Sequence, residues 1–364
     1  MQNNQAIPFN KENFKQILSK KFALVIIISV PSAIAAEFFN VPLAWFLGPM
    51  LITSMASLAG FKTKMPRLVL SSVLIFLGLY IGNYIDKTLF SQMHQWAWTS
   101  LIMLGYIILS VLLVSKYLQK FSKYDKKTSI FSAAPGALGP LMILAEDEKS
   151  DLSQVATSHL IRLIIIITVF PFIVNTLHNV EDTKLIVKII ENQNISHLFI
   201  LITLSIIMIL IFDKFKVPAA LLTGTLVASG FLQITELAVY KLSPNIIDYC
   251  LLILGSSVGC RFADKSFNEI ARNALHSFVA TFMLVTLGFF AAYIAGLVID
   301  KNFFTLLLSF CPGGIYEVAV IAIFFDLDPE FVAFHHIIRL LMILFIVPVI
   351  LRIIEKKPKK DSRF

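Results

Sequence analysis

Residues 309–348 read SFCPGGIYEVAVIAIFFDLDPEFVAFHHIIRLLMILFIVP, and residues 132–171 read SAAPGALGPLMILAEDEKSDLSQVATSHLIRLIIIITVFP. The two stretches align without a gap at an offset of 177 and are identical at 13 of 40 positions. Chance similarity between apolar segments does not match helix breakers and polar residues, so these matches indicate an internal duplication. The informative pairs are Pro135/Pro312, Gly136/Gly313, Asp151/Asp328, His159/His336, Arg162/Arg339 and Pro171/Pro348.

The repeat extends toward the N-terminus of each half. Val41, Pro42 and Gly48 match Val217, Pro218 and Gly224 at an offset of 176, and Gly78 and Gly82 match Gly255 and Gly259 at 177. The duplication is interrupted near residues 178–196. We therefore divide the chain into an N-terminal tail (1–21), a first membrane repeat (22–177), a linker (178–196), a second membrane repeat (197–351) and a basic C-terminal tail (352–364).

Composition places both repeats in a membrane. Of 364 residues, 57% are hydrophobic and only 15% are charged, and the mean hydropathy is +0.80. The charges gather between apolar stretches of about 17–25 residues, the length that crosses a bilayer as a helix. We predict an all-α polytopic membrane protein with apolar segments at 22–39, 42–60, 66–85, 96–115, 129–145, 152–177, 197–212, 217–234, 245–260, 273–299, 303–325 and 331–351.

Two of the twelve segments, 129–145 and 303–325, contain helix breakers, namely Pro135-Gly136 and Pro312-Gly313-Gly314. If both cross the membrane, the two halves have the same orientation. If both are re-entrant, each half has five spans, about ten in total, and the second half is inverted. The positive-inside rule favours inversion, because it places Lys214, Lys216, Arg261, Lys265 and Arg272 on the cytoplasmic side, together with both termini. A Pro-Gly segment that crosses as a broken helix remains the alternative.

Ionisable residues within apolar segments are functional candidates because burying them in a membrane is costly. The repeated His-x-x-Arg pattern gives His159 and Arg162 in the first half and His336 and Arg339 in the second, with His335 beside His336. A spacing of three places both side chains on one helix face. The histidine can carry a proton near neutral pH, and the arginine guanidinium offers a fork that binds an anion. The alternative is structural, with arginine holding the carbonyls of the broken segment and histidine as a buried hydrogen-bond partner.

The broken segments supply the remaining candidates for substrate binding. Pro135, Gly136 and Gly139 belong to the first, and Pro312, Gly313, Gly314 and Glu317 to the second. Glycine lets a ligand approach backbone amides, and a helix that starts after the break directs its N–H groups at an anion. Glu317 would bind a cation or proton, or else form a salt bridge with Arg339. Pro140 occupies the equivalent position in the first half, so an acid-dependent role would be asymmetric.

The chain resembles the AbrB family of bacterial membrane proteins over nearly its whole length. The resemblance rests on PLAWFLGP at residues 42–49, on Pro312-Gly-Gly-x-x-Glu317 with the following His-x-x-Arg helix, and on the duplication. The sequence departs from the family pattern at Tyr316, where a small hydroxyl residue is usual. The family carries the labels regulator of gene expression and ammonia monooxygenase. Its fold is similar to that of the cation:proton antiporters and anion transporters with inverted five-helix repeats.

These observations predict a secondary transporter of a small organic anion in the bacterial inner membrane, with lipid and a small-molecule or ion substrate as partners. A membrane regulator acting indirectly on gene expression is the second reading, since no loop is long enough for a DNA-reading module. An ammonia monooxygenase is remote, because the histidines and three cysteines lack metal-ligand spacing. We expect no enzyme activity, catalytic residue, metal, cofactor or direct nucleic-acid contact. A homo-oligomer remains possible.

Overall fold

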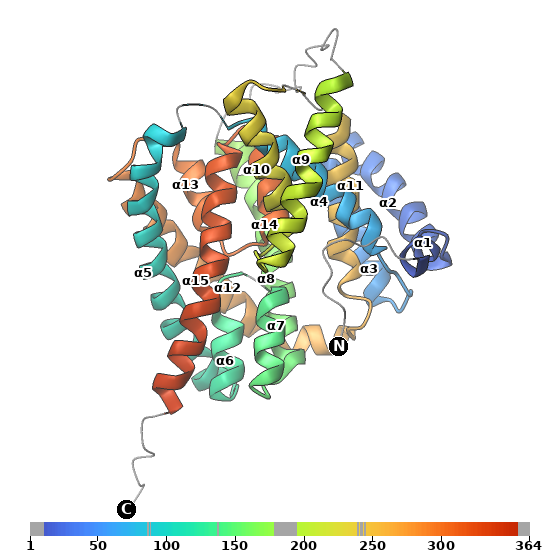
Figure 1. The fold of residues 1–364 in the computed structure, drawn as a ribbon. Coiled ribbons are helices and arrows are strands. Elements are labelled where there is room, and N and C mark those ends of the chain that lie inside the picture. The colour runs from blue at the N-terminus through green and yellow to red at the C-terminus, as the bar shows by residue number, and fades with distance from the viewer. Residues whose placement is uncertain are drawn as a thin grey trace, which may run out of the picture. The chain divides into compact units, whose positions relative to one another are not determined.

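The computed structural model describes residues 11–85, 87, 89–136, 138–177, 195–238, 240, 243 and 245–355. All regular secondary structure in these ranges is helical, and the protein is a polytopic membrane protein (Figure 1). The predicted linker 178–196 and the predicted tails 1–21 and 352–364 lie wholly or partly outside the described residues.

The helices follow the predicted segments closely. They are α1 (Lys11–Ile17), α2 (Lys20–Phe38), α3 (Ala44–Leu58), α4 (Arg67–Gly82), α5 (Leu89–Phe121), α6 (Lys126–Ala133), α7 (Leu138–Asp147), α8 (Leu152–Leu177), α9 (Ile195–Lys214), α10 (Ala220–Thr235), α11 (Asn245–Cys260), α12 (Phe267–Gly296), α13 (Phe303–Phe310), α14 (Ile315–Phe324) and α15 (Pro329–Glu355). Both Pro-Gly segments are split, into α6 and α7 and into α13 and α14.

Ten helices correspond to the ten predicted spans, but they differ in length. Six of them are long and apolar enough to cross a membrane: α2, α5, α8, α9, α12 and α15. The other four, α3, α4, α10 and α11, have only 15 or 16 residues. α3 and α10 begin late because Leu43 and Ala219, each following a proline, take left-handed φ angles of 52° and 55° that cannot continue a helix.

The chain forms two compact units, and each unit draws on both halves of the sequence repeat. Unit 1 comprises 1–94, 167–269 and 316–333, and therefore holds α2, α3 and α4 together with α9, α10 and α11. Unit 2 comprises 95–166, 270–315 and 334–364, and holds α6, α7 and α13 with most of α5, α8, α12 and α15.

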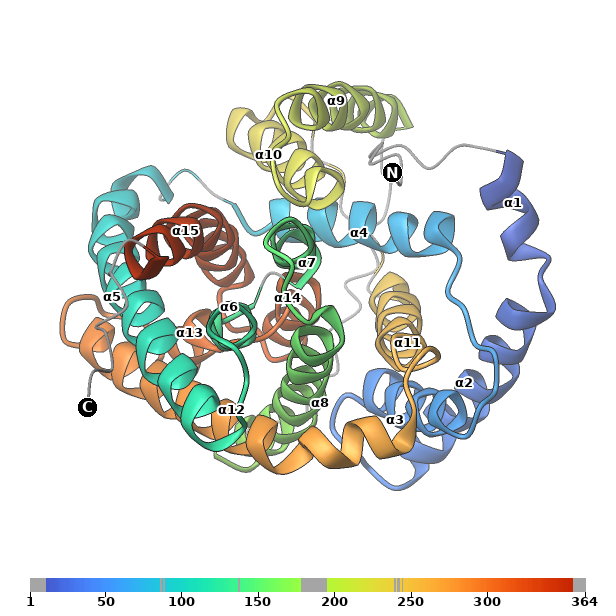
Figure 2. The same cartoon turned by 90° about the horizontal axis from the view of Figure 1, so that it is seen from below.

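Unit 1 is held together by reciprocal contacts between the repeats. α4 of the first half packs on α10 of the second, and α11 of the second packs on α3 of the first (Figure 2). The matched glycines make both contacts close: a Cβ at Gly78 would lie 2.3 Å from the Leu222 oxygen, and one at Gly255 would lie 2.3 Å from the Phe46 oxygen. Small residues allow such approach between membrane helices. The duplication is therefore visible as a two-fold pattern of packing.

The same contacts give the relative direction of the repeats. A Cβ at Gly78 would meet Leu222, and one at Gly82, a turn later, would meet Leu226, so α4 and α10 run in the same direction. In the predicted topology α3 and α4 are consecutive spans, which cross the membrane in opposite directions. Consequently α3 and α10, which occupy matching positions in the two repeats, run in opposite directions. With that topology, the packing within unit 1 corresponds to the inverted repeats that the distribution of basic residues predicts.

Backbone geometry repeats as well. Asn40, Leu43 and Gly60 have positive φ, and so do Lys216, Ala219 and Glu236, which stand 176 positions later. Such angles are unfavourable for residues other than glycine, so their recurrence shows that the loops, and not only the helices, were inherited from one ancestral repeat.

In unit 2 the first broken segment packs on the long helices. Ala133 of α6 lies in one buried cluster with Val114 and Leu118 of α5 and with Ala280 and Leu284 of α12. This apolar contact anchors α6 at the end where it meets the proline, and so positions the break described next.

Candidate functional site

Proline stops both broken helices in the same way. The residues that precede the prolines, Ala134 and Cys311, are extended, with φ and ψ of −61° and 129° and of −62° and 130°. Proline disfavours the helical region for the residue before it and lacks an N–H of its own. Matching prolines in the two halves therefore produce matching backbone turns.

The start and the end of the first broken segment lie close together. Lys127, at the start of α6, forms an ion pair of 2.5 Å with Glu148, just after α7. Thr128 Oγ1 accepts a hydrogen bond of 2.9 Å from the amide of Asp151. α6 and α7 also lie next to each other in Figure 1. The segment is therefore a re-entrant hairpin and not a span, which is what the inverted arrangement requires.

The entrance of this hairpin is tied to α12. Tyr124, between α5 and α6, donates a hydrogen bond of 3.2 Å to Asn273 Oδ1. Burial raises the pKa of the Tyr124 phenol above its ordinary value, so the hydroxyl keeps the proton that it donates. Asp125 accepts bonds from the amides of Lys127 and Thr128 and caps α6.

The first clamp, His159 and Arg162 of α8, holds the C-terminal end of α6. His159 Nε2 donates 3.0 Å to the Phe131 carbonyl, and Arg162 Nη1 donates 2.6 Å to the Ala134 carbonyl. Arg162 Nη2 donates to the Ser132 carbonyl. Both side chains are buried, His159 with 5% and Arg162 with 2% exposed. A positive group at the carbonyl end of a helix is favourable because it meets the negative end of the helix dipole.

The second clamp, His336 and Arg339 of α15, repeats this arrangement on α13. His336 Nε2 donates 3.0 Å to the Leu308 carbonyl, and Arg339 donates through Nη1 to the Cys311 carbonyl and through Nη2, at 2.7 Å, to the Gly313 carbonyl. In both clamps the histidine bond and the Nη1 bond span 28 residues of sequence. The structural reading of the His-x-x-Arg motif therefore describes the contacts correctly.

The two clamps differ in the state of their histidines. Arg339 Nη2 also donates 3.0 Å to His336 Nδ1, so both ring nitrogens of His336 are engaged and a proton added at Nδ1 would break that bond. His159 makes one hydrogen bond with the described residues, through Nε2, which leaves its Nδ1 available. Of the two clamp histidines, only His159 thus has a ring nitrogen, Nδ1, that makes no hydrogen bond with a described residue.

The two breaks meet at Arg339. Gly136 has φ of 98°, and a Cβ there would lie 2.8 Å from Arg339 Nη2 and 3.2 Å from the Gly313 oxygen. A side chain at this position would be strained and would collide with the guanidinium. Glycine is therefore needed where the first hairpin touches the second clamp.

The clamps carry two buried positive charges. Neither guanidinium has a carboxylate partner among the residues that the structure describes, and carbonyl oxygens accept their bonds instead. In the first clamp Arg162 Nε and Ser132 Oγ are buried without a hydrogen-bond partner in the described ranges. Ser309 Oγ, the equivalent of Ser132, donates 2.8 Å to the Thr305 carbonyl. Unsatisfied buried donors are costly, so an acceptor for either of these two atoms would be stabilising.

Glu317 does not pair with Arg339, and that alternative prediction is wrong. Glu317 is 1% exposed and accepts a bond of 2.8 Å from Arg261 Nη2, at the end of α11, whereas Arg339 is engaged by the carbonyls of the break. The sequence did not identify Arg261 as a partner of Glu317, because Arg261 was used only to predict the orientation of the repeats. A paired carboxylate in unit 1 remains a candidate for ion binding.

The remaining predicted residues lie apart from these contacts. A Cβ at Gly139 would meet no atom within 4 Å, so Gly139 faces open space on α7. Gly314 is partly exposed. His335 is fully buried and forms a hydrogen bond of 2.7 Å with Thr99 Oγ1, a partner that no sequence pattern predicted. The described residues include no group of three His, Cys, Asp or Glu placed to hold a metal ion.

Comparison with known proteins finds related sequences but no solved structure. The family model described as "Transition state regulatory protein AbrB" matches residues 2–88 and 45–355. "Uncharacterized protein YhjN" of Bacillus subtilis is 22% identical over 93% of this chain and 95% of its own. "Putative regulator AbrB" of Escherichia coli is 21% identical over 94% of this chain and 99% of its own. No solved structure matches the chain.

Proposed function

We propose a transport function for this chain, which belongs to the AbrB family of membrane proteins. In this proposal it is a secondary transporter that carries a small organic anion across the bacterial inner membrane, with both termini in the cytoplasm. Inverted repeats with broken helices are the architecture in which secondary transporters bind their substrates.

The observation that carries the proposal is the unsatisfied donor pair of the first clamp. Arg162 Nε and Ser132 Oγ are buried donors without acceptors in the described part of the chain. Two buried guanidinium groups that no described carboxylate pairs with favour a negative ligand, and a carboxylate oxygen is a good acceptor for an arginine N–H. Arg162 would then be the contact to substrate, while Arg339 holds the two breaks together.

His159 completes the proposal by supplying a proton site. Its Nδ1, which makes no hydrogen bond with a described residue, lies on the same clamp as Arg162. Protonation of His159 would add positive charge beside the anion site and so couple substrate binding to proton binding.

The test is transport by protein reconstituted into liposomes, assayed with radiolabelled acetate, succinate and citrate at two values of the pH gradient. We expect uptake of at least one carboxylate, and Arg162→Lys should raise its KM because lysine lacks the Nε–H and the fork. Gly139→Ala, on the hairpin but in open space, is the matched control. Absence of uptake of all three, or an Arg162→Lys variant that is folded and unchanged in KM, would refute the proposal.

A second candidate, a membrane regulator acting indirectly on gene expression, is favoured by one observation, the name of the Escherichia coli relative. The two functions are compatible if the transported solute is the signal. Deletion followed by transcript measurement, with and without the added carboxylate, separates them. If the added solute restores the transcripts, transport is the primary function.

A further inference from the structure

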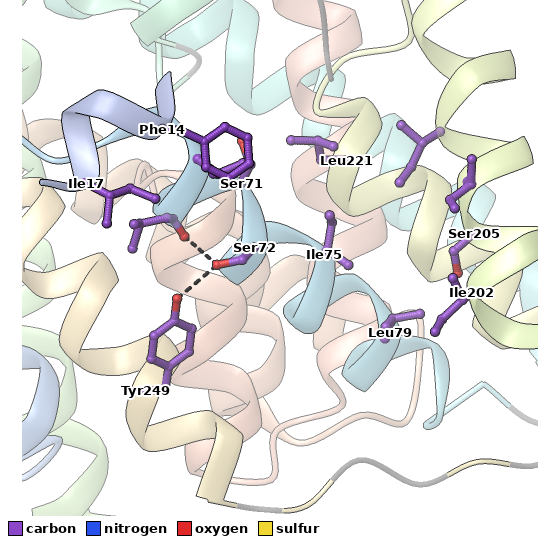
Figure 3. A pocket seen from close by; sticks show the side chains of 14 residues that line it. Phe14, Ile17, Ser71, Ser72, Ile75, Leu79, Ile202, Ser205, Leu221 and Tyr249 are labelled. Carbon is purple, nitrogen blue, oxygen red and sulfur yellow. Dashed lines mark hydrogen bonds between the residues drawn. The ribbon is translucent and has the colours of Figure 1, made fainter. Parts of the chain in front are cut away.

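An apolar cavity of about 670 Å³ opens in unit 1 (Figure 3). Its wall includes Phe14 and Ile17 of α1, Ile75 and Leu79 of α4, and the face of α9 formed by Ile202, Ser205, Ile206 and Ile209. Ser72 is satisfied within the wall: its Oγ donates 2.7 Å to the Val69 carbonyl and lies 2.9 Å from the Tyr249 hydroxyl. The cavity is therefore suited to a hydrocarbon chain.

One polar group in this wall lacks a partner. Ser205 is 4% exposed, and its Oγ has no hydrogen-bond partner within the described ranges. Figure 3 shows it among the side chains around the cavity. A buried hydroxyl in an otherwise apolar wall calls for an acceptor, such as an ester carbonyl.

A second cavity, of about 650 Å³, adjoins the first, and Ser71 and Leu221 line both. Its ionisable walls carry two cations, Arg67 and Lys216, and one carboxylate, Asp213. Lys216 forms no ion pair with a described residue, and the charge of this cavity is positive overall. The two cavities thus place an apolar chamber next to a cationic one, with Ser71 and Leu221 in the wall of both.

The helix ends reinforce the positive charge. α4 begins at Arg67 and α10 begins at Ala220, and both residues line the second cavity. The residues that precede these helices, Pro66 and Ala219, give them no side-chain cap. The amides at helix N-termini favour anions.

We propose that the joined cavities of unit 1 bind an anionic phospholipid of the surrounding membrane. The phosphate occupies the chamber of Arg67 and Lys216, an ester carbonyl accepts from Ser205, and an acyl chain fills the chamber along α4 and α9. Charge complementarity selects an anionic over a zwitterionic headgroup, and each chamber is within the size range of small-ligand sites. The site is independent of the anion site proposed in unit 2.

The test uses the full-length protein purified in detergent, with apparent melting temperature measured against added lipid. Phosphatidylglycerol should stabilise the protein saturably and more than phosphatidylcholine with the same acyl chains. Lys216→Gln should weaken phosphatidylglycerol binding about fivefold, the equivalent of about 1 kcal/mol for one cation, and leave phosphatidylcholine unchanged. Lys120→Gln, a basic residue at the end of α5 that does not line the cavities, is the control.

The acyl chamber is tested by filling it. Ile202→Trp should abolish the stabilisation by phosphatidylglycerol, whereas Ile200→Trp, which is on the same helix, similarly exposed and outside the wall, should retain it. Equal stabilisation by both lipids, equal behaviour of the two tryptophan variants, or full stabilisation by inorganic phosphate alone would each overturn the proposal. The last of these outcomes would indicate a site for a soluble anion.

Discussion

Replacing Gly136 with alanine tests whether the two breaks are locked together at Arg339. Gly136 has φ of 98°, where an alanine is strained by about 1–2 kcal/mol. Its Cβ would also lie 2.8 Å from Arg339 Nη2, which must move and lose its bond to the Gly313 carbonyl. A hydrogen bond from a charged donor contributes about 1.5–3 kcal/mol. Together the two effects predict a loss of about 3–5 kcal/mol.

The assay is thermal unfolding in detergent, followed with a thiol-reactive dye that reports the exposure of the buried Cys250 and Cys311. At about 2 °C per kcal/mol, Gly136→Ala should melt about 6–10 °C below the wild type. Gly139→Ala lies three residues further on the same hairpin and has open space for its Cβ, so it should melt within about 2 °C of the wild type. If Gly136→Ala is as stable as Gly139→Ala, the contact between the breaks does not exist as described.

Three further predictions concern unit 1, the first hairpin and the repeat contact. Arg261→Ala should destabilise the protein toward the lower end of about 3–5 kcal/mol, because it leaves the buried carboxylate of Glu317 without a partner, although Arg261 itself is part-exposed. In a double-mutant cycle, adding Glu317→Gln should restore much of the lost stability, and additive losses would contradict the pairing. Cysteines at Lys126 and Glu148 should be labelled by an impermeant reagent from the same side of the membrane, and labelling from opposite sides would show that the segment crosses. Gly78→Ala should lower the melting temperature sharply, because its Cβ would lie 2.3 Å from a backbone oxygen of α10 that cannot move aside; a silent substitution would contradict the close contact of the repeats.

The sequence by itself determined the class of protein, the positions of the spans and the duplication. Apolar length and helix breakers act locally, so the prolines at 135 and 312 predicted breaks that the structure places in the same residues. The clamps were one of two readings of the shared His-x-x-Arg motif, because a spacing of three directs both side chains to one face of a helix. Gly136 was singled out for the same local reason, its place after a proline.

Only the tertiary structure decided which groups meet. That Arg339 binds the carbonyls of the break while Arg261 pairs with Glu317 depends on which helices become neighbours, and arginines at either position carry the same charge in the sequence. The re-entry of the first hairpin rests on Lys127 meeting Glu148 across 21 residues, and the assembly of unit 1 rests on α4 packing on a helix of the other repeat. Such contacts are long-range, because inverted repeats bring together segments that local sequence patterns cannot pair.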